Sequence, residues 1–269
     1  MRKFFRPCFQ VLLGSLLLFS KLEGEEYPAR YEGIDLFRAS GAIDLSVLPQ
    51  FLPYNPIVVE VGAYYGAQAI QASKLWPKAK IFAFEPNPNA FEKLQKLVAE
   101  SGCTNVSAYN LALSNYAGEA MLYLCHGTNG NDPVFEFASS LLPPSKAMEI
   151  HYQGPKINVP CVVLDNWCLA NQIDHIDILK LELEGFELPV LESSPQILKN
   201  TKVVVVQTHF FPSRIGITHY ANLRAFLKES GFLLLSHWYR DGLGGNAIFL
   251  SREVWDAYFK LSLGLDWED

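Results

Sequence analysis

Residues 58 to 69 read VVEVGAYYGAQA, in which a run of β-branched residues is followed by two glycines. A helical pattern begins after the second glycine. A strand, a glycine turn and a helix in this order typically hold a cofactor at the helix N-terminus. The turn has the form acid-x-Gly-x-x-x-Gly and consists of Glu60, Gly62 and Gly66. The spacing of these glycines indicates which cofactors fit.

Two common cofactor turns do not match this spacing. A dinucleotide-binding turn needs glycines at positions 62, 64 and 67, but positions 64 and 67 hold Tyr and Ala. A P-loop needs Gly-Lys followed by Ser or Thr near positions 67 to 69, which read AQA. The remaining arrangement offers helix N–H groups that suit a carboxylate, and Glu60 adds an acceptor that suits an ammonium.

A second acid, Glu85, ends the next predicted strand and lies 23 residues after Gly62 (85 minus 62). In dinucleotide-binding folds an acid at this position bonds to ribose hydroxyls. A ligand with an amino acid head group, a ribose and no phosphate is S-adenosylmethionine. We therefore expect this cofactor. The alternative is a tight strand-to-helix turn that holds no ligand.

The chain around this stretch alternates between strand and helix patterns. Short apolar runs predict strands, and capped amphipathic segments predict helices. Strands are expected at 57–61, 80–85, 105–113 (the strand together with its exit), 176–183 and 202–208, helices at 66–76, 87–102 and 218–231, and two closing strands at FLLLSHW and GNAIFLS. Asn87 and Thr218 are the expected caps of the second and third helices. The alternation is typical of an α/β fold with a Rossmann-like, doubly wound sheet.

Residues 125 to 160 interrupt this alternation between the third and fourth strands. The segment is rich in Gly, Pro, Asn and Ser and is too long for a simple connection. We interpret it as an inserted loop region that shapes an acceptor site. The predicted organisation is a lead-in segment at 25–55, followed by one α/β domain at 56–269 that contains the insertion.

The composition limits the classes of function. The chain has 269 residues, of which 49% are hydrophobic and 19% charged, which suits one globular domain with a full core. The formal net charge is −6, and no run rich in Lys and Arg occurs beyond the N-terminus. Nucleic acid is therefore not an expected partner, because phosphate binding needs a basic surface.

The N-terminus resembles a secretory signal peptide. The basic segment MRKFFR precedes the apolar run FQVLLGSLLLF and the polar SKLEGEE. The apolar run is shorter than the roughly 17–25 residues of a membrane span. We expect residues 1–24 to lie outside the fold and favour export or membrane anchoring through this segment, which is the only membrane contact expected. A cytoplasmic tail is the alternative.

Five cysteines are present, and none forms a CxxC pair, so no zinc site is expected. Cys8 lies in the leader, and the others are interpreted as small buried hydrophobes. Cys125 and Cys161 bracket the insertion. The segments YLC and VPC, in which they occur, are predicted to be neighbouring antiparallel strands that bring the two thiols close together. In an oxidising compartment they could then form a disulfide.

Several segments together resemble the FkbM-type methyltransferases. They span roughly residues 56 to 250 in the family's order and read VVEVGAYYG, FAFEPNPNAFEKL, NLALSNYAG, SSL, VVLDNW, IDILKLELEGFELPVLESS and GNAIFLS. The resemblance implies the class I methyltransferase fold, S-adenosylmethionine as donor, and O-methylation of a hydroxyl on a small molecule or glycan. Two positions depart from the family's pattern, because it usually has Asp at Glu182 and Glu at the end of QTH (207–209).

By position, the resemblance implies a set of residues around the cofactor. Gly62, Glu85 and Asn87 would surround it, and Ala112, with Asn110 nearby, would border the adenine. The acid and the two glycines of the turn are added to these positions, together with the adjacent residues Ala63 and Pro86. The predicted cofactor-binding residues are then Glu60, Gly62, Ala63, Gly66, Glu85, Pro86, Asn87, Asn110 and Ala112.

The acidic stretch KLELEGFE (180–187) ends the fourth strand, where open α/β sheets bind ligands. Lys180 and Glu182 point to the same side of a strand, so an ion pair can fix the carboxylate. Glu182 is the leading candidate to orient the acceptor hydroxyl or take its proton, and Glu184 and His209 are its rivals. A catalytic metal is not expected. Asp165 is interpreted as a helix N-cap instead of a catalyst.

Two other functions remain open from the sequence. One is an exported binding or structural protein on a lapsed methyltransferase fold, which the leader motivates because the donor is made in the cytoplasm. The intact Glu60, Gly62, Gly66 and Glu85 argue against that reading. The other is a nicotinamide-dependent oxidoreductase, which Tyr64 and the alanine at 67 disfavour.

Overall fold

A computed structural model describes residues 45–127, 130, 133–240 and 244–263. The predicted leader at 1–24 and most of the lead-in segment lie outside these residues. The described part of the lead-in contains two short 3-10 helices, η1 (Leu45–Val47) and η2 (Pro49–Phe51). Among the described residues, no helix is long and apolar enough to cross a membrane.

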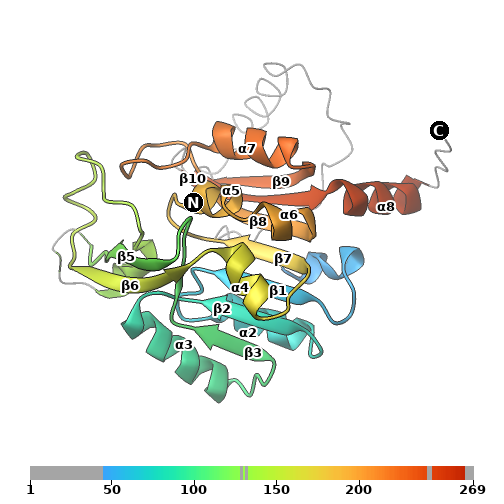
Figure 1. Cartoon of the computed structure of the whole chain (residues 1–269), viewed down its shortest axis with the longest axis horizontal. Helices are drawn as coiled ribbons and strands as arrows, with labels where there is room; N and C mark the ends of the chain where they lie inside the picture. The colour runs from blue at the N-terminus through green and yellow to red at the C-terminus, as the bar shows by residue number, and fades with distance from the viewer. Residues whose placement is uncertain (1–44, 128–129, 131–132, 241–243, 264–269) are drawn as a thin grey trace, which may run out of the picture. The chain divides into compact units, whose positions relative to one another are not determined.

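The core of the fold is a seven-stranded sheet with the order β3-β2-β1-β7-β8-β10-β9 (Figure 1). The first five strands in this order are parallel, and β10 runs antiparallel to β8 and β9. Their bounds are β1 Ile57–Val61, β2 Lys80–Phe84, β3 Val106–Tyr109, β7 Ile176–Leu181, β8 Thr201–His209, β9 Phe232–Arg240 and β10 Gly244–Ser251. The predicted α/β fold with a doubly wound, Rossmann-like sheet is confirmed, including the closing hairpin.

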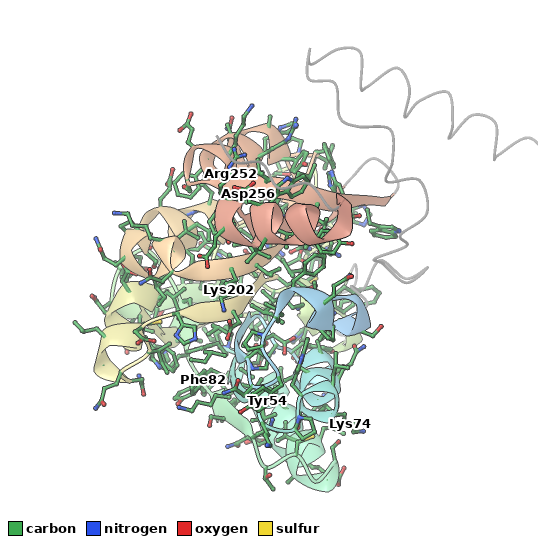
Figure 2. All side chains as sticks on the ribbon, turned by 90° about the vertical axis from the view of Figure 1, so that its right-hand side faces the viewer. Tyr54, Lys74, Phe82, Lys202, Arg252 and Asp256 are labelled. Carbon is green, nitrogen blue, oxygen red and sulfur yellow. The ribbon has the colours of Figure 1, made fainter. Side chains whose placement is uncertain are left out.

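Helices cover both faces of this sheet. One face packs against α4 (Leu164–Ala170), α5 (Glu187–Glu192), α6 (Pro195–Lys199) and α7 (Tyr220–Glu229). The other packs against η1, α2 (Ala67–Leu75), α3 (Pro88–Glu100) and α8 (Arg252–Leu263) (Figure 2, where Lys74 marks α2 and Arg252 and Asp256 mark α8). This is why the central strands are apolar on both sides.

Residue alternation along the strands separates the two apolar cores. Val204 and Val206 of β8 belong to the core under α4 to α7, whereas Val203 and Val205 belong to the core under α2, α3 and α8. Successive side chains of a strand point to opposite faces, so a run of valines serves both layers. In β1, likewise, Val59 belongs to the core under α4 to α7, and its neighbour Val58 belongs to the other core.

A second, three-stranded sheet has the order β4-β6-β5. β4 (Ala112–Leu113) pairs parallel with β6 (Lys156–Val162), which pairs antiparallel with β5 (Gly118–Tyr123). The segment predicted as the third strand and its exit, 105–113, divides in this way, since the chain leaves the main sheet after Tyr109. Its last two residues form β4 and join the second sheet, which the sequence did not predict. The remainder of the insertion contains η3 (Pro133–Ala138).

The predicted proximity of Cys125 and Cys161 is wrong. The two segments do form neighbouring antiparallel strands, as expected, but the register pairs Cys161 with Gly118. Cys125 comes seven residues after Gly118, which corresponds to roughly 20 Å along a strand. Both thiols are free and buried, and burial raises the pKa of each. The interpretation as small buried hydrophobes fits them.

Two predicted caps differ in detail. The third predicted helix begins at Tyr220, and His219 is its N-cap through Nδ1, which accepts the N–H of Ala221 at 3.3 Å. Asp165 caps a helix other than its own. Its carboxylate accepts the N–H groups of Gln196 and Ile197, at 3.0 and 2.8 Å, in the first turn of α6. Such a cap between distant segments cannot be read from local sequence.

Candidate active site

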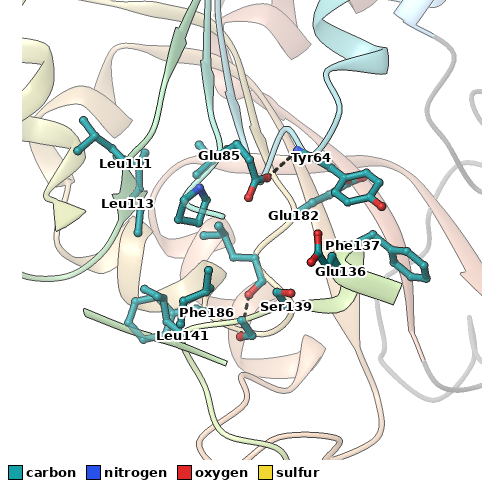
Figure 3. Close-up of a pocket in the computed structure, with 17 residues that line it drawn as sticks. Tyr64, Glu85, Leu111, Leu113, Glu136, Phe137, Ser139, Leu141, Glu182 and Phe186 are labelled. Atoms are coloured by element: carbon teal, nitrogen blue, oxygen red, sulfur yellow. Dashed lines mark hydrogen bonds between the residues drawn. The ribbon is translucent and has the colours of Figure 1, made fainter. Parts of the chain in front are cut away.

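A pocket lies at the carboxyl ends of β1, β2 and β7 and extends beneath the insertion (Figure 3). One side is apolar and comes from β4, β5 and the loops after β3, η3 and β7. The other side carries the polar groups. The lining residues are Val61, Gly62, Tyr64, Glu85, Pro86, Leu111, Ala112, Leu113, Leu122, Glu136, Phe137, Ser139, Ser140, Leu141, Glu182, Leu183 and Phe186. This is the edge at which open α/β sheets bind ligands.

Gly62 ends β1 in the left-handed region, with φ of 78°. A Cβ at this position would lie 2.0 Å from the backbone oxygen of Glu182, so the strand ends of β1 and β7 approach too closely for any side chain. The N–H groups of Gly62 and Ala63 both donate to Phe84 O, at 3.0 and 2.9 Å. These two donors are therefore engaged within the protein.

Tyr64 occupies the position where a dinucleotide-binding turn has its second glycine. It adopts φ of 50°, which is uncommon for a bulky residue. Its N–H donates to Glu85 Oε2 at 2.7 Å, and its ring lines the pocket beside Phe137, with ring centroids 6.3 Å apart. Gly66 ends the turn at φ of 79°, where a Cβ would meet Leu94 of α3 at 2.8 Å.

Glu85 joins the glycine turn to the end of β2. Its other oxygen, Oε1, accepts the N–H of Asn87 at 2.8 Å. The side chain is buried, and burial raises its pKa to about 7 although the two N–H groups oppose this shift. Each oxygen retains a further lone pair, so the carboxylate can still accept a ribose hydroxyl.

The loop after β2 is held from two sides. Asn110 donates through Nδ2 to the backbone oxygens of Glu85 and Pro86, at 2.9 and 3.1 Å. Asn87 caps α3 by accepting the N–H of Asn89 at 3.1 Å, as the sequence predicted. Pro86 and Ala112 line the pocket, whereas Asn87 and Asn110 lie outside its lining and support the residues that form it.

A buried lysine connects the two acids of the neighbouring strands. Lys180 Nζ lies 3.3 Å from Glu60 Oε1 and 2.9 Å from Glu182 Oε2. Burial lowers the pKa of Lys180, but the carboxylates of Glu182 and Glu60 outweigh this effect, and the net shift is upward. The ion pair expected between Lys180 and Glu182 is therefore present. Glu182 lines the pocket, whereas Glu60 is buried and does not.

Glu184 and His209 lie outside the pocket lining. Glu184 Oε1 accepts Gln207 Nε2 at 2.7 Å, and its backbone N–H donates to Gln207 Oε1 at 3.1 Å. His209 is buried with Nε2 3.6 Å from Glu187 Oε1. Burial alone would lower the pKa of His209. The carboxylate of Glu187 raises this pKa by a larger amount, so the net shift is upward. Of the three catalytic candidates, Glu182 alone lines the pocket.

Two contacts attach the insertion to the main sheet. Ser140 Oγ donates to the backbone oxygens of Leu183 and Glu184, at 3.2 and 3.3 Å. Arg214, in the loop after β8, is buried and donates to the backbone oxygens of Leu142 and Ala138. These contacts fix the part of the insertion that lines the pocket.

Glu136 is a pocket residue that the sequence analysis did not name. It lies in η3 between two aromatic residues, in the stretch FEF (135–137), and is only 4% exposed. Its Oε1 lies 3.2 Å from His126 Nε2. The sequence feature that could have indicated Glu136 was an acid between two aromatic residues, in the insertion assigned to the acceptor site. That signal is weak because loop acids are usually solvated.

The charges of the lining fit a cationic ligand. Three acids, Glu85, Glu136 and Glu182, line the pocket, and no Lys, Arg or His stands among its described lining residues. S-adenosylmethionine carries a sulfonium and an ammonium against one carboxylate, and its adenine suits an apolar wall. Among the described residues, no group of three or more His, Cys, Asp or Glu side chains is arranged to hold a metal ion.

Comparison with known proteins identifies the family. The methyltransferase FkbM domain matches residues 60–234, which is more than half of the chain. The chain belongs to the FkbM methyltransferase family. The resemblance that the motifs predicted is thereby confirmed, as is the class I methyltransferase type of fold. Membership supports S-adenosylmethionine as the cofactor of this domain.

Three relatives of the FkbM domain are informative by name. The 2-O-methyltransferase NoeI of Sinorhizobium fredii is 23% identical over 57% of this chain and 63% of its own length. Methyltransferase sdnD of Sordaria araneosa is 29% identical over 67% of this chain and 75% of its own length. The hexuronic acid methyltransferase AglP of Haloferax volcanii is 23% identical over 58% of this chain and 56% of its own length. The match therefore covers less than two thirds of NoeI and AglP.

Proposed function

We propose that this protein is an S-adenosylmethionine-dependent O-methyltransferase that acts on a hydroxyl of a small molecule or glycan. Membership of the FkbM family supports methyl transfer, and the names of NoeI and AglP support oxygen and a sugar as acceptor. The observation that carries the proposal is a partly exposed carboxylate, Glu182, fixed by a buried lysine at the edge of an acid-lined pocket.

The bound cofactor supplies an electrophilic methyl group on a positively charged sulfur. The protein has to bind it, orient the acceptor hydroxyl, exclude water and accept the hydroxyl proton. Glu85 offers lone pairs to ribose hydroxyls, and the apolar wall of Leu111, Leu113 and Leu141 suits the adenine. Charge is neutralised as a cationic donor meets a developing alkoxide, so a dry pocket favours the reaction.

Glu182 is the residue proposed to orient the acceptor hydroxyl and take its proton. Lys180 restrains its carboxylate by holding Oε2, and the side chain is 36% exposed, so part of the group remains accessible. A carboxylate is a weak base for an alcohol, but it can accept the proton as the methyl group is transferred. Glu184 and His209 are less suited because neighbouring side chains engage them outside the pocket.

Methyl transfer to a panel of neutral and acidic sugars and small alcohols, followed by mass spectrometry, tests the proposal. Glu182→Gln should lower turnover by on the order of 10²-fold or more while cofactor affinity stays nearly unchanged. Glu184→Gln is the matched control and should stay active. Full turnover of Glu182→Gln together with loss in His209→Ala would assign the role to His209.

We also propose that residues 1–24 export the protein or anchor it to a membrane. The leader pattern at 1–24 supports export or anchoring, and a mature N-terminus at Met1 in cytosolic protein would contradict it.

A binding protein on a lapsed fold is the competing function. It requires a chain that does not bind the cofactor, so a direct cofactor titration separates the two.

A further inference from the structure

Glu136 has one oxygen for which the described residues supply no partner. Its Oε1 lies 3.2 Å from His126 Nε2, whereas Oε2 is buried and makes no hydrogen bond to any residue that the structure describes. The residue as a whole is 4% exposed. A buried carboxylate oxygen without a donor is costly, so a ligand that supplies a donor would stabilise it.

The other two acids of the pocket lining differ from Glu136 in this respect. Glu85 accepts a backbone N–H on each oxygen, from Tyr64 and Asn87. Glu182 is held by Lys180 at 2.9 Å and is partly exposed to solvent. Glu85 therefore has a donor on each oxygen, and Glu182 has a cation beside it and access to solvent. Glu136 is the lining acid that still lacks a donor.

The main chain around Glu136 is fixed by several contacts. Ser139 N–H donates to Glu136 O at 3.0 Å, and Ser139 Oγ accepts the N–H of Cys125 at 3.1 Å. Arg214 holds the next residues through Ala138 O and Leu142 O. Figure 3 shows the Glu136 carboxylate pointing from η3 toward the side of the pocket where Tyr64 and Glu182 lie. The acid is thus built into the pocket wall.

We propose that Glu136 binds the ammonium group at the amino acid end of S-adenosylmethionine, an inference that rests on the proposed function. An ammonium supplies both a positive charge and N–H donors, whereas a sulfonium has no hydrogen to donate. Glu60, the acid that the sequence assigned to the ammonium, is bound to Lys180 and lies outside the pocket lining. Glu136 is therefore the acid that we assign to the ammonium in place of Glu60.

Two rings beside Glu136 fit the same ligand. Tyr64 and Phe137 line the pocket with their centroids 6.3 Å apart, and Phe137 is 52% exposed. Aromatic faces attract cations and pack against aliphatic chains, so they suit the methionine part of the donor. The insertion thereby contributes both an acid and a ring to donor binding, in addition to any contact with the acceptor.

Calorimetric titration with three commercially available ligands tests this assignment without an acceptor. S-adenosylmethionine and S-adenosylhomocysteine both carry the ammonium, and only the former carries the sulfonium. 5′-Methylthioadenosine retains adenine, ribose and thioether but lacks the amino acid end. Glu136→Gln should weaken binding of the first two by roughly 10- to 100-fold and leave the third unchanged. Glu136→Asp keeps the charge and should restore part of the affinity.

Glu149→Gln, at an exposed position of the same insertion, is the matched control and should leave all three affinities unchanged. A loss confined to S-adenosylmethionine would overturn the assignment in favour of the sulfonium. Unchanged affinities for all three ligands, or an equal loss for all three, would also overturn it. A wild-type chain that binds none of them would instead contradict the proposed function.

Discussion

Two regions contribute acids to the pocket in different ways. The strand-end frame is formed by the carboxyl ends of β1, β2 and β7. Its polar side chains pair with or accept hydrogen bonds from other groups of the protein. Lys180 is shared by Glu60 and Glu182, and Glu85 receives two backbone N–H groups. The insertion, by contrast, brings Glu136 to the same pocket with one oxygen that no described residue bonds. We infer that the polar groups of the frame serve stability as well as ligand binding, whereas Glu136 serves chiefly ligand binding.

The largest effect on stability is expected at Lys180. Lys180→Met leaves the buried Glu60 without its cation and removes the partner that fixes Glu182. Breaking a buried ion pair from one side costs about 3–5 kcal/mol, so the free energy of unfolding in urea should fall by that amount. Lys96→Met is the control, because the Lys96–Glu100 pair is exposed and contributes less than about 1 kcal/mol. Equal losses in the free energy of unfolding of the two variants would contradict a stabilising role of Lys180 in the frame.

A pair of glycines gives a second comparison between the regions. Gly62→Ala places a Cβ against Glu182 O and forces a left-handed residue, which should cost about 2–4 kcal/mol. Gly130, in the insertion, also has positive φ, but its Cβ would meet, within the part of the chain that the structure describes, only the Gln153 side chain at 3.4 Å. Gly130→Ala should cost about 1 kcal/mol. Thermal unfolding of both variants checks the difference, and a similar cost for both would refute the close approach of β1 and β7.

The pH dependence of stability should report on Glu85. Burial raises the pKa of Glu85 in the folded state to about 7, above the ordinary value of 4.5 for a glutamate, so the folded state binds the proton more tightly than the unfolded state. The stability that this group contributes is complete below about pH 4.5 and is lost as pH rises through about 7. Glu85→Gln should remove this fall, which is on the order of 1–3 kcal/mol. Urea unfolding at several pH values checks it, and an unchanged slope in the variant would show that another group is responsible.

A smaller and local effect is expected at Arg214. Arg214→Met removes the donors to Leu142 O and Ala138 O, so the insertion should open more readily while the frame stays closed. Hydrogen exchange should show a loss of about 1–2 kcal/mol of protection near residues 138–142, with β1 and β7 unchanged. Arg252→Met, at an exposed position, is the control. Loss of protection throughout the sheet would mean that the insertion and frame are one cooperative unit.

The sequence predicted the frame well because its signals are local. The β-branched runs, the glycines of the turn and the Asn87 cap each act within a few residues, and all appear at the expected places. The ion pair of Lys180 with Glu182 followed from the two-residue period of a strand. These features depend on geometry that neighbouring residues share.

The rest of the site depends on contacts between distant segments. Glu60 could not be assigned to Lys180 from the sequence, since 120 positions separate them. The engagement of Gly62 and Ala63 N–H by Phe84 O follows from strand packing, and the register of β5 on β6 separates Cys125 from Cys161. The insertion shows the same limit, because Glu136 enters the pocket only through tertiary contacts.

The most direct test of the central claim is calorimetric titration of S-adenosylmethionine into the chain without residues 1–24. We expect saturable binding at one site. Glu85→Ala should weaken it by about 1–3 kcal/mol, because the variant removes a buried acceptor that is in position for the ribose. No heat of binding at millimolar cofactor, with the protein shown to be folded, would contradict the claim that this pocket holds the methyl donor.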